Sequence, residues 1–142
     1  MIRPVQAEDA PVIARHRYPA EADAAERPIY AQWVAGAISR GLYLGFLALD
    51  GEKVVAGAGL TLLEWGPSRG DPQPWRGRVV NVWTQPEDRR RGLARELVEC
   101  CVDAARERGI IRLSLGTSAA ARHLYESLGF TSSSTEMTLF LR

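Results

Sequence analysis

A strand, a helix and a second strand follow one another in the second half of the chain, and this order strongly constrains the fold. Val79–Thr84 is a short apolar run that predicts a buried strand, and Pro86 ends it because proline cannot donate to a sheet ladder. Leu93–Arg108 repeats apolar residues at helical spacing, and Gly109 follows as a stop signal. Ile110–Leu115 predicts the next strand. Such a unit places its two strands parallel in one sheet with a right-handed crossover.

The residues before this unit predict an antiparallel hairpin. Leu42–Leu49 and Val54–Leu63 are strand-like runs separated by the turn signal Asp50-Gly51. The hairpin and the parallel pair together predict an α/β (mixed α+β) fold, with one mixed sheet of about six to seven strands and about four helices on its two faces. The other predicted elements are a strand over Ile2–Gln6, helices beginning near Glu8 and Pro28, a short helix from Ser118 to Gly129, and a closing hairpin over Phe130–Leu141.

Length and charge bound the class of protein. The 142 residues suit a single domain over 1–142, and a net charge of +1 argues against a nucleic-acid-binding surface. No apolar run is long enough to cross a bilayer and the first residues do not resemble a signal peptide, so we expect no membrane partner and a cytoplasmic protein. The chain has only two cysteines, which are adjacent, and two histidines, so we expect no metal site.

Three arginines and a glycine stand at the start of the predicted helix after Thr84. Arg89, Arg90 and Arg91 precede Gly92 and then Leu93-Ala94. A helix N-terminus has unpaired N–H groups and a partial positive charge, so it attracts phosphate. A glycine without Cβ lets the phosphate approach the backbone, and arginines add charge-assisted hydrogen bonds. The alternative is a solvated basic turn, but the strand–loop–helix context favours a diphosphate site.

Two motifs resemble the GNAT superfamily of acyl-CoA-dependent N-acetyltransferases. Arg89, Gly92 and Ala94 fill the defining positions of its [QR]-x-x-G-x-[GA] signature, which lies between a strand and a helix. The segment Leu124–Phe130 reads LYESLGF and is similar to the LYExLGF segment of the family. The two motifs have the expected order and separation. The resemblance covers nearly the whole chain and implies a GNAT-like fold whose parallel pair of strands splays apart.

The resemblance also implies how acetyl-CoA is held. The backbone amides from Arg89 to Ala94 would bind the pyrophosphate, and the strand ending at Thr84 would pair with the pantetheine arm. The helix beginning at Ser118 would border the cofactor, with Arg122 within reach of its phosphates. The residues expected to bind the cofactor are therefore Val82, Trp83, Thr84, Arg89, Arg90, Arg91, Gly92, Leu93, Ala94, Ser118 and Arg122.

Two residues are candidates for moving protons. Tyr125 matches the tyrosine that serves as general acid in the family, and it would donate a proton to the departing thiolate; otherwise it is a core tyrosine. The family often places a glutamate on the strand before the phosphate loop, but Val79-Val80-Asn81-Val82 has no acid. Glu64 is the nearest alternative base by topology, although it could equally be an ordinary surface acid, and no base is needed if the amine arrives deprotonated.

The acceptor site has no motif of its own. His16, on the predicted first helix, and Asn81, on the central strand, are candidates for lining it. The segment from Glu64 to Gly77 predicts a long loop, and its Trp65 would cover the acceptor or simply anchor the loop.

The resemblance implies transfer of an acetyl group from acetyl-CoA to a primary amine, by direct attack in a ternary complex. The acceptor would be a small molecule or a peptide N-terminus. A non-catalytic acyl-CoA-binding or sensing domain is the alternative; it would keep the phosphate site without a use for Tyr125. Dimers are common in the family, so a homodimer is also open.

Overall fold

The computed structural model describes residues 1–141, and within them five strands form one mixed sheet in the order β1-β2-β3-β4-β5. The first four strands pair antiparallel and only β4 and β5 pair parallel, as the sequence predicted. The strands are β1 (Ile2–Pro4), β2 (Tyr43–Asp50), β3 (Lys53–Glu64), β4 (Trp75–Thr84) and β5 (Leu113–Ser114). The α-helices are α1 (Ala10–Arg17), α2 (Arg27–Ser39), α3 (Leu93–Glu107) and α4 (Arg122–Ser127), and the 3-10 turns are η1 (Ala7–Asp9), η2 (Glu21–Glu26) and η3 (Pro86–Asp88).

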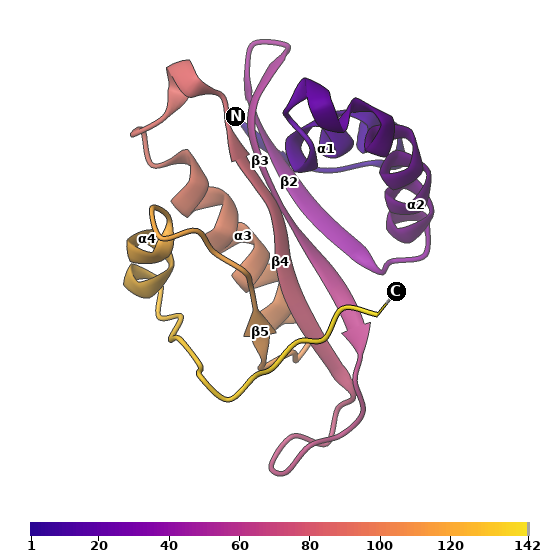
Figure 1. Cartoon of the computed structure of the whole chain (residues 1–142), viewed down its shortest axis with the longest axis vertical. Helices are drawn as coiled ribbons and strands as arrows, with labels where there is room; N and C mark the ends of the chain where they lie inside the picture. The colour runs from indigo at the N-terminus through magenta and orange to yellow at the C-terminus, as the bar shows by residue number, and fades with distance from the viewer. Residues whose placement is uncertain (142) are drawn as a thin grey trace.

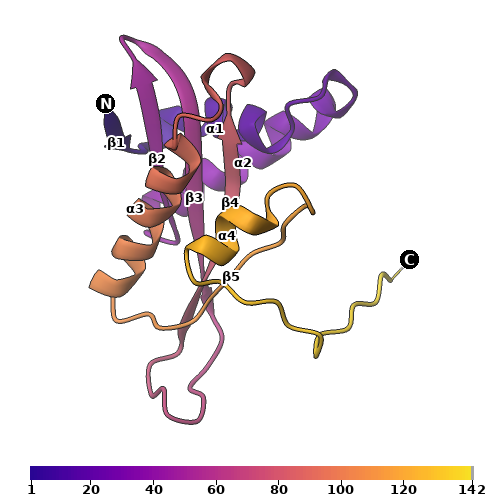
Figure 2. The same ribbon diagram turned by 90° about the vertical axis from the view of Figure 1, so that its left-hand side faces the viewer.

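The helices cover the sheet from both sides. α1 and α2 lie on one face, and α3 and α4 lie on the other (Figures 1 and 2). Leu97 on α3 and Leu60 on β3 are fully buried on the α3 side, where complete burial of a leucine contributes about 1.5–3 kcal/mol. On the other face, Ile13 of α1 and Val34 of α2 form a second cluster of buried side chains with Tyr43 of β2. The sheet is therefore held between two separate apolar layers.

The structure differs from the sequence prediction in two segments, residues 130–141 and 64–77. The prediction of a closing hairpin over 130–141 is wrong, because residues 130–141 form no strand and their side chains are mostly exposed. The sheet consequently has five strands rather than six or seven. The predicted loop over 64–77 is shorter, since Glu64 pairs with Trp75 and extends the β3–β4 hairpin.

Among residues 1–141, none of the helices combines the length and the apolar composition that a bilayer crossing requires.

Candidate active site

In the part of the chain that the structure describes, the parallel strands β4 and β5 pair only at Gly77–Leu113 and Arg78–Ser114. A bulge lies on β4 just beyond this pairing: Asn81 and Val82 together oppose the single residue Ala58 of β3. Asn81 adopts a left-handed conformation with φ of +58°, which asparagine tolerates better than most residues. A bulge bends its strand and interrupts the ladder, so it accounts for the splay between β4 and β5 that the resemblance implied.

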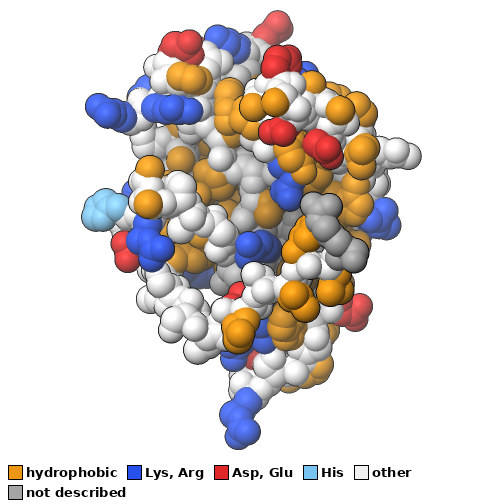
Figure 3. Space-filling model, viewed as in Figure 1, with side chains coloured by type: hydrophobic (Ala, Val, Ile, Leu, Met, Phe, Trp, Pro, Cys, Tyr) orange, Lys and Arg blue, Asp and Glu red, His pale blue; other side chains and the backbone are white. Residues whose placement is uncertain are grey.

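The splay opens into a groove of about 660 Å³ between the end of β4, the first turn of α3 and α4. Figure 3 shows this face of the molecule hollowed, with hydrophobic side chains in the hollow and Lys and Arg side chains at its edge. Most of the residues predicted to bind the cofactor line this groove: Val82, Trp83, Thr84, Arg89, Arg90, Gly92, Leu93, Ala94 and Ser118.

The start of α3 forms the polar end of the groove. Gly92 is the residue before the helix and has φ of +76°, a conformation that favours glycine. A Cβ placed on Gly92 would meet no heavy atom within 4 Å, so the space above its backbone is open. No side chain caps the helix, and its first N–H groups have no partners within the helix. This geometry fits a phosphate group, as the sequence predicted.

Two of the predicted arginines do not line the groove. Arg91 forms an ion pair with Asp88 at 2.7 Å and lines a separate cavity beside Met1. Arg122 extends from α4 toward Ser132 and donates a hydrogen bond to its hydroxyl. The side chains of Arg91 and Arg122 therefore point away from the groove in this structure, and cofactor contacts for them stay a prediction.

Arg95 also lines the groove, although it was not among the predicted cofactor contacts. It lies in the first turn of α3 and donates a hydrogen bond to Ser127 of α4. Its place three residues after Gly92 could have indicated this, because residues in the first turn of a helix lie around the helix N-terminus.

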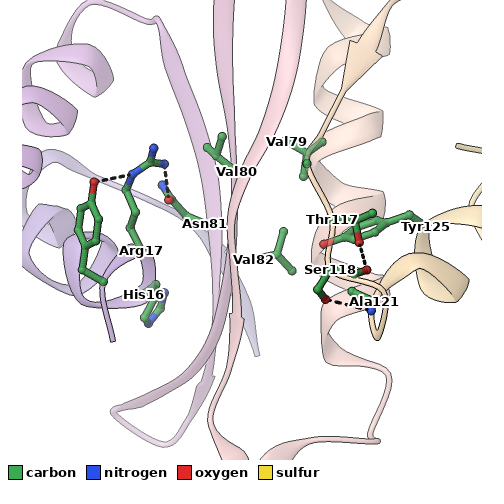
Figure 4. Close-up of a pocket in the computed structure, with 12 residues that line it drawn as sticks. His16, Arg17, Val79, Val80, Asn81, Val82, Thr117, Ser118, Ala121 and Tyr125 are labelled. Atoms are coloured by element: carbon green, nitrogen blue, oxygen red, sulfur yellow. Dashed lines mark hydrogen bonds between the residues drawn. The ribbon is translucent and has the colours of Figure 1, made fainter. Parts of the chain in front are cut away.

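A second cavity of about 490 Å³ lies beside the groove, along residues 79–82 of β4. Figure 4 shows His16, Arg17 and Asn81 on one side of this cavity, Tyr125 with the 117–118 loop on the other, and the β4 valines between them. The two cavities share four lining residues, which are Val82, Ser118, Ala121 and Tyr125.

Tyr125 lies where the two cavities meet. It comes from α4, whose start is stabilised by a hydrogen bond from the Ala121 backbone N–H to the Ser118 hydroxyl at 3.2 Å. Its ring packs edge-on against Phe130 at 6.0 Å, and the residue is 7% exposed. Burial raises the pKa of the Tyr125 phenol, so it stays protonated and able to donate at neutral pH.

His16 lies on the α1 side of the second cavity. Its ring stacks on Trp83 with centroids 4.4 Å apart and covers Gly57, where an added Cβ would lie 2.7 Å from the His16 Nδ1. Burial, and to a lesser extent the nearby charge of Arg15, lowers the pKa of His16 to about 4. The imidazole is therefore neutral at pH 7 and is a weak base.

Asn81 connects the bulge to three neighbouring side chains. Its amide nitrogen donates to the hydroxyls of Tyr30 at 2.8 Å and Tyr43 at 3.0 Å, and its amide oxygen accepts from Arg17 Nη1 at 3.2 Å. Sequence reasoning missed Arg17, because its position depends on how α1 packs on β4.

Comparison with known proteins identifies the family. The sequence model of the acetyltransferase (GNAT) family matches residues 8–130. The chain belongs to the GNAT family. This membership confirms the resemblance found in the two motifs, and with it the class of acetyl-CoA-dependent N-acetyltransferases.

Two solved structures share the fold over nearly the whole chain. A GCN5-related N-acetyltransferase from Ralstonia eutropha JMP134 is 28% identical, with a TM-score of 0.90 over 99% of this chain and 97% of that one. A chain from Clostridium acetobutylicum, described as a predicted acetyltransferase with acetyl-CoA, is 19% identical and also has a TM-score of 0.90, over 99% of this chain and 95% of that one. The second comparison supports the fold alone.

One curated relative matches only a part of the chain. The [ribosomal protein bS18]-alanine N-acetyltransferase of Salmonella typhimurium is 44% identical over 55 residues. The matched stretch spans 37% of this chain and 37% of that protein.

Two residues predicted for the GNAT site lie away from it. Glu64 pairs with Trp75 at the end of the β3–β4 hairpin remote from the bulge, and it lines neither cavity. Trp65, which follows it, is 60% exposed and packs on the Arg76 guanidinium at 4.2 Å. The structure therefore places Glu64 and Trp65 outside both cavities, because the hairpin carries both residues to the opposite end of the sheet, and it agrees with the alternatives of a surface acid and a loop anchor.

Carboxylates and metal ligands are scarce around the second cavity. Its twelve lining residues within 1–141 include no aspartate or glutamate. The same described residues contain no group of three or more His, Cys, Asp or Glu side chains arranged to hold a metal ion.

Proposed function

We propose that this chain transfers the acetyl group of acetyl-CoA to a primary amine of a small molecule, by direct attack in a ternary complex. The observation that supports this most is the junction of the two cavities at Tyr125. The groove contains the open N-terminus of α3, which suits a diphosphate. The second cavity does not include this helix start, but Tyr125 lines it as well. Two substrates can therefore meet at one proton donor.

The groove would hold acetyl-CoA by its phosphates and by its pantetheine arm. Backbone N–H groups near Gly92 would bind the diphosphate, with Arg89, Arg90 and Arg95 around it. The bulge at Asn81 frees the end of β4 on its β5 side, so the backbone around Trp83 would pair with the arm as a short extra strand. The bound thioester supplies an already activated acetyl group.

Tyr125 would act as the general acid. The leaving thiolate has a reference pKa near ~8.5, and a phenol donates a proton to it when held within hydrogen-bond reach. The raised pKa of Tyr125 suits this role, because the proton remains on the phenol until the thiolate develops.

The amine must be neutral when it attacks. An alkylamine has a pKa near ~10, so about one molecule in a thousand is neutral at pH 7. Among residues 1–141, no carboxylate lines the second cavity to take the proton, and His16 is a weak base. We therefore propose that the acceptor enters already deprotonated, with His16 and the Asn81 network positioning it or its water.

A peptide N-terminus is a second candidate acceptor. It is supported by the name of the Salmonella typhimurium relative, which acts on an alanine of a ribosomal protein. Peptides with N-terminal alanine therefore belong in the same assay as small amines.

The test is an assay of acetyl-CoA with a panel of amines, in which coenzyme A thiol release and the mass of the acetylated product are measured together. We expect acetylated product with at least one amine and a strong loss in Tyr125→Phe. Binding of acetyl-CoA without product from any amine would contradict the enzyme and favour the acyl-CoA-sensing alternative, with which the missing carboxylate also agrees.

A further inference from the structure

Arg17 is a cation in the second cavity that no acidic side chain neutralises. It ends α1 and lines the cavity, and it forms no ion pair with any carboxylate in residues 1–141. Its side chain donates hydrogen bonds to two neutral groups: Nη1 to the Asn81 amide oxygen at 3.2 Å and Nε to the Tyr18 hydroxyl at 3.4 Å. The fork of a guanidinium carries five N–H donors, so donors remain for a ligand.

Aromatic rings and the bulge hold this guanidinium in place. Its central carbon lies 4.6 Å from the centre of the Tyr30 ring and 5.7 Å from that of Tyr18. Burial lowers the pKa of Arg17, but the interactions with Tyr18 and Tyr30 raise it by more, so the guanidinium stays charged. The Asn81 contact ties the guanidinium to the strand that forms the floor of the cavity. A fixed fork loses less conformational freedom when it binds a ligand than a mobile side chain does.

The position of Arg17 relative to Tyr125 suggests which part of an acceptor it meets. Figure 4 shows Arg17 and Tyr125 on opposite sides of the cavity, with the valines of β4 between them. An amine attacking near Tyr125 would therefore have the rest of its molecule directed toward Arg17. A guanidinium in this place attracts a carboxylate or a phosphate, which it binds through two parallel hydrogen bonds, and it repels a second ammonium group.

We propose that Arg17 binds an anionic group, a carboxylate or a phosphate, on a small primary amine that is the acceptor. The inference rests on the proposed acetyl transfer and names the class of acceptor: amino acids and amino phosphates rather than polyamines or lysine-rich peptides. Asn81 is then a positioning residue, because it holds Arg17 and has no contact of its own with the anion.

The experiment compares matched pairs of acceptors at saturating acetyl-CoA. One pair is an amino acid with its carboxamide, and the other is phosphoethanolamine with ethanolamine; spermidine serves as a cationic acceptor. We expect kcat/KM to be about 10- to 100-fold higher for the anionic member of at least one pair. The two pairs distinguish a carboxylate from a phosphate.

Variants then assign the preference to Arg17. Arg17→Gln should remove the preference for the anionic acceptor by raising its KM, while the KM for acetyl-CoA stays unchanged. Arg15→Gln is the matched control, because Arg15 lies on the same helix and does not line this cavity, and it should retain the preference. Arg17→Lys should restore a part of it, since the charge returns without the fork.

The outcomes separate the two proposals. The role of Arg17 would be overturned if the anionic and neutral acceptors of both pairs were acetylated equally, or if the preference survived in Arg17→Gln. Either result would leave the proposed acetyl transfer intact. Acetyl-CoA binding with no acetylation in any arm would overturn the proposed function, and the inference with it.

Discussion

The Tyr43 hydroxyl on β2 accepts a hydrogen bond of 3.0 Å from Asn81 on β4, although β3 runs between the two strands. The phenol reaches across β3 above Gly59, where an added Cβ would lie 1.8 Å from its oxygen. The absence of a side chain at Gly59 thus allows β2 to support the bulge that opens the groove. Burial raises the pKa of Tyr43, so its hydroxyl remains protonated and neutral beneath the site.

Gly59→Ala should destabilise the protein, because the methyl group would collide with the Tyr43 ring. We expect a loss of about 1–3 kcal/mol in the free energy of unfolding, measured by urea denaturation. The cost should be smaller in a Tyr43→Leu background, where the end of the ring is missing. An equal cost in the two backgrounds would mean that Tyr43 does not occupy this space.

Substitutions of Asn81 separate the backbone bulge from the side-chain network. Asn81→Gly introduces a residue that adopts φ of +58° without steric cost. It removes the hydrogen bonds to Arg17, Tyr30 and Tyr43. Asn81→Ala removes the same bonds and adds about 1 kcal/mol of backbone strain. We expect the alanine variant to be the less stable of the two in urea denaturation. Equal stability would argue against the left-handed conformation.

Tyr125→Phe should leave acetyl-CoA affinity within about twofold and lower kcat on the order of 100-fold, because only the proton donor is lost. Binding is measured by calorimetry and kcat by thiol release. Unchanged kcat would remove Tyr125 from the mechanism.

The pH dependence of kcat gives a second readout for Tyr125. Because its pKa is raised, the phenol stays protonated past the usual value of about 10, and wild-type kcat should not fall on the alkaline side below that pH. A fall in kcat at pH 8–9 would contradict Tyr125 as the acid.

His16 should make stability depend on pH. In the unfolded chain it takes up a proton near pH 6.5, whereas in the folded protein its pKa is about 4. The unfolded state therefore binds more protons between these values, and the free energy of unfolding falls as pH drops from about 7 to about 4, by about 3 kcal/mol at most.

The variants His16→Gln and His123→Gln test the origin of this dependence. His123 is exposed on α4, so its loss should leave the pH dependence of urea denaturation unchanged. The loss of His16 should flatten it between pH 7 and pH 4. The same slope in all three proteins would show that other groups cause it.

Local patterns predicted most of the fold. The turn at Asp50-Gly51, the periodicity of α3 and its limits at Gly92 and Gly109 are determined by neighbouring residues, and the structure agrees with each. The hairpin predicted over 130–141 depended on a long-range partner. The free edge that it would join is β5, which is only two residues long and so provides few backbone groups for pairing with another strand.

The open start of α3 was predictable for the same reason, because Gly92 and its neighbours form one short motif. The second cavity was predictable only in part: His16, Asn81 and Tyr125 were candidates and line it, whereas Arg17 was missed because its position depends on packing that no local pattern specifies. Glu64 lies at the end of the hairpin remote from the bulge, and its place in the strand order did not indicate which end of the sheet it occupies. The position of the bulge at Asn81 was not predictable from the residues, because a single asparagine in a strand has many explanations.

Titration calorimetry of acetyl-CoA with wild-type protein, Gly92→Glu and Gly109→Glu tests the central claim most directly. Both glycines have positive φ at the ends of α3 with open space above them, so the two substitutions carry similar backbone strain. Glutamate at position 92 would occupy the anion site and repel phosphate. We predict that wild-type protein and Gly109→Glu bind acetyl-CoA equally, and that Gly92→Glu binds about 100-fold more weakly or not at all. Equal affinity in all three proteins, or no binding by the wild type, would contradict the assignment of this groove to acetyl-CoA.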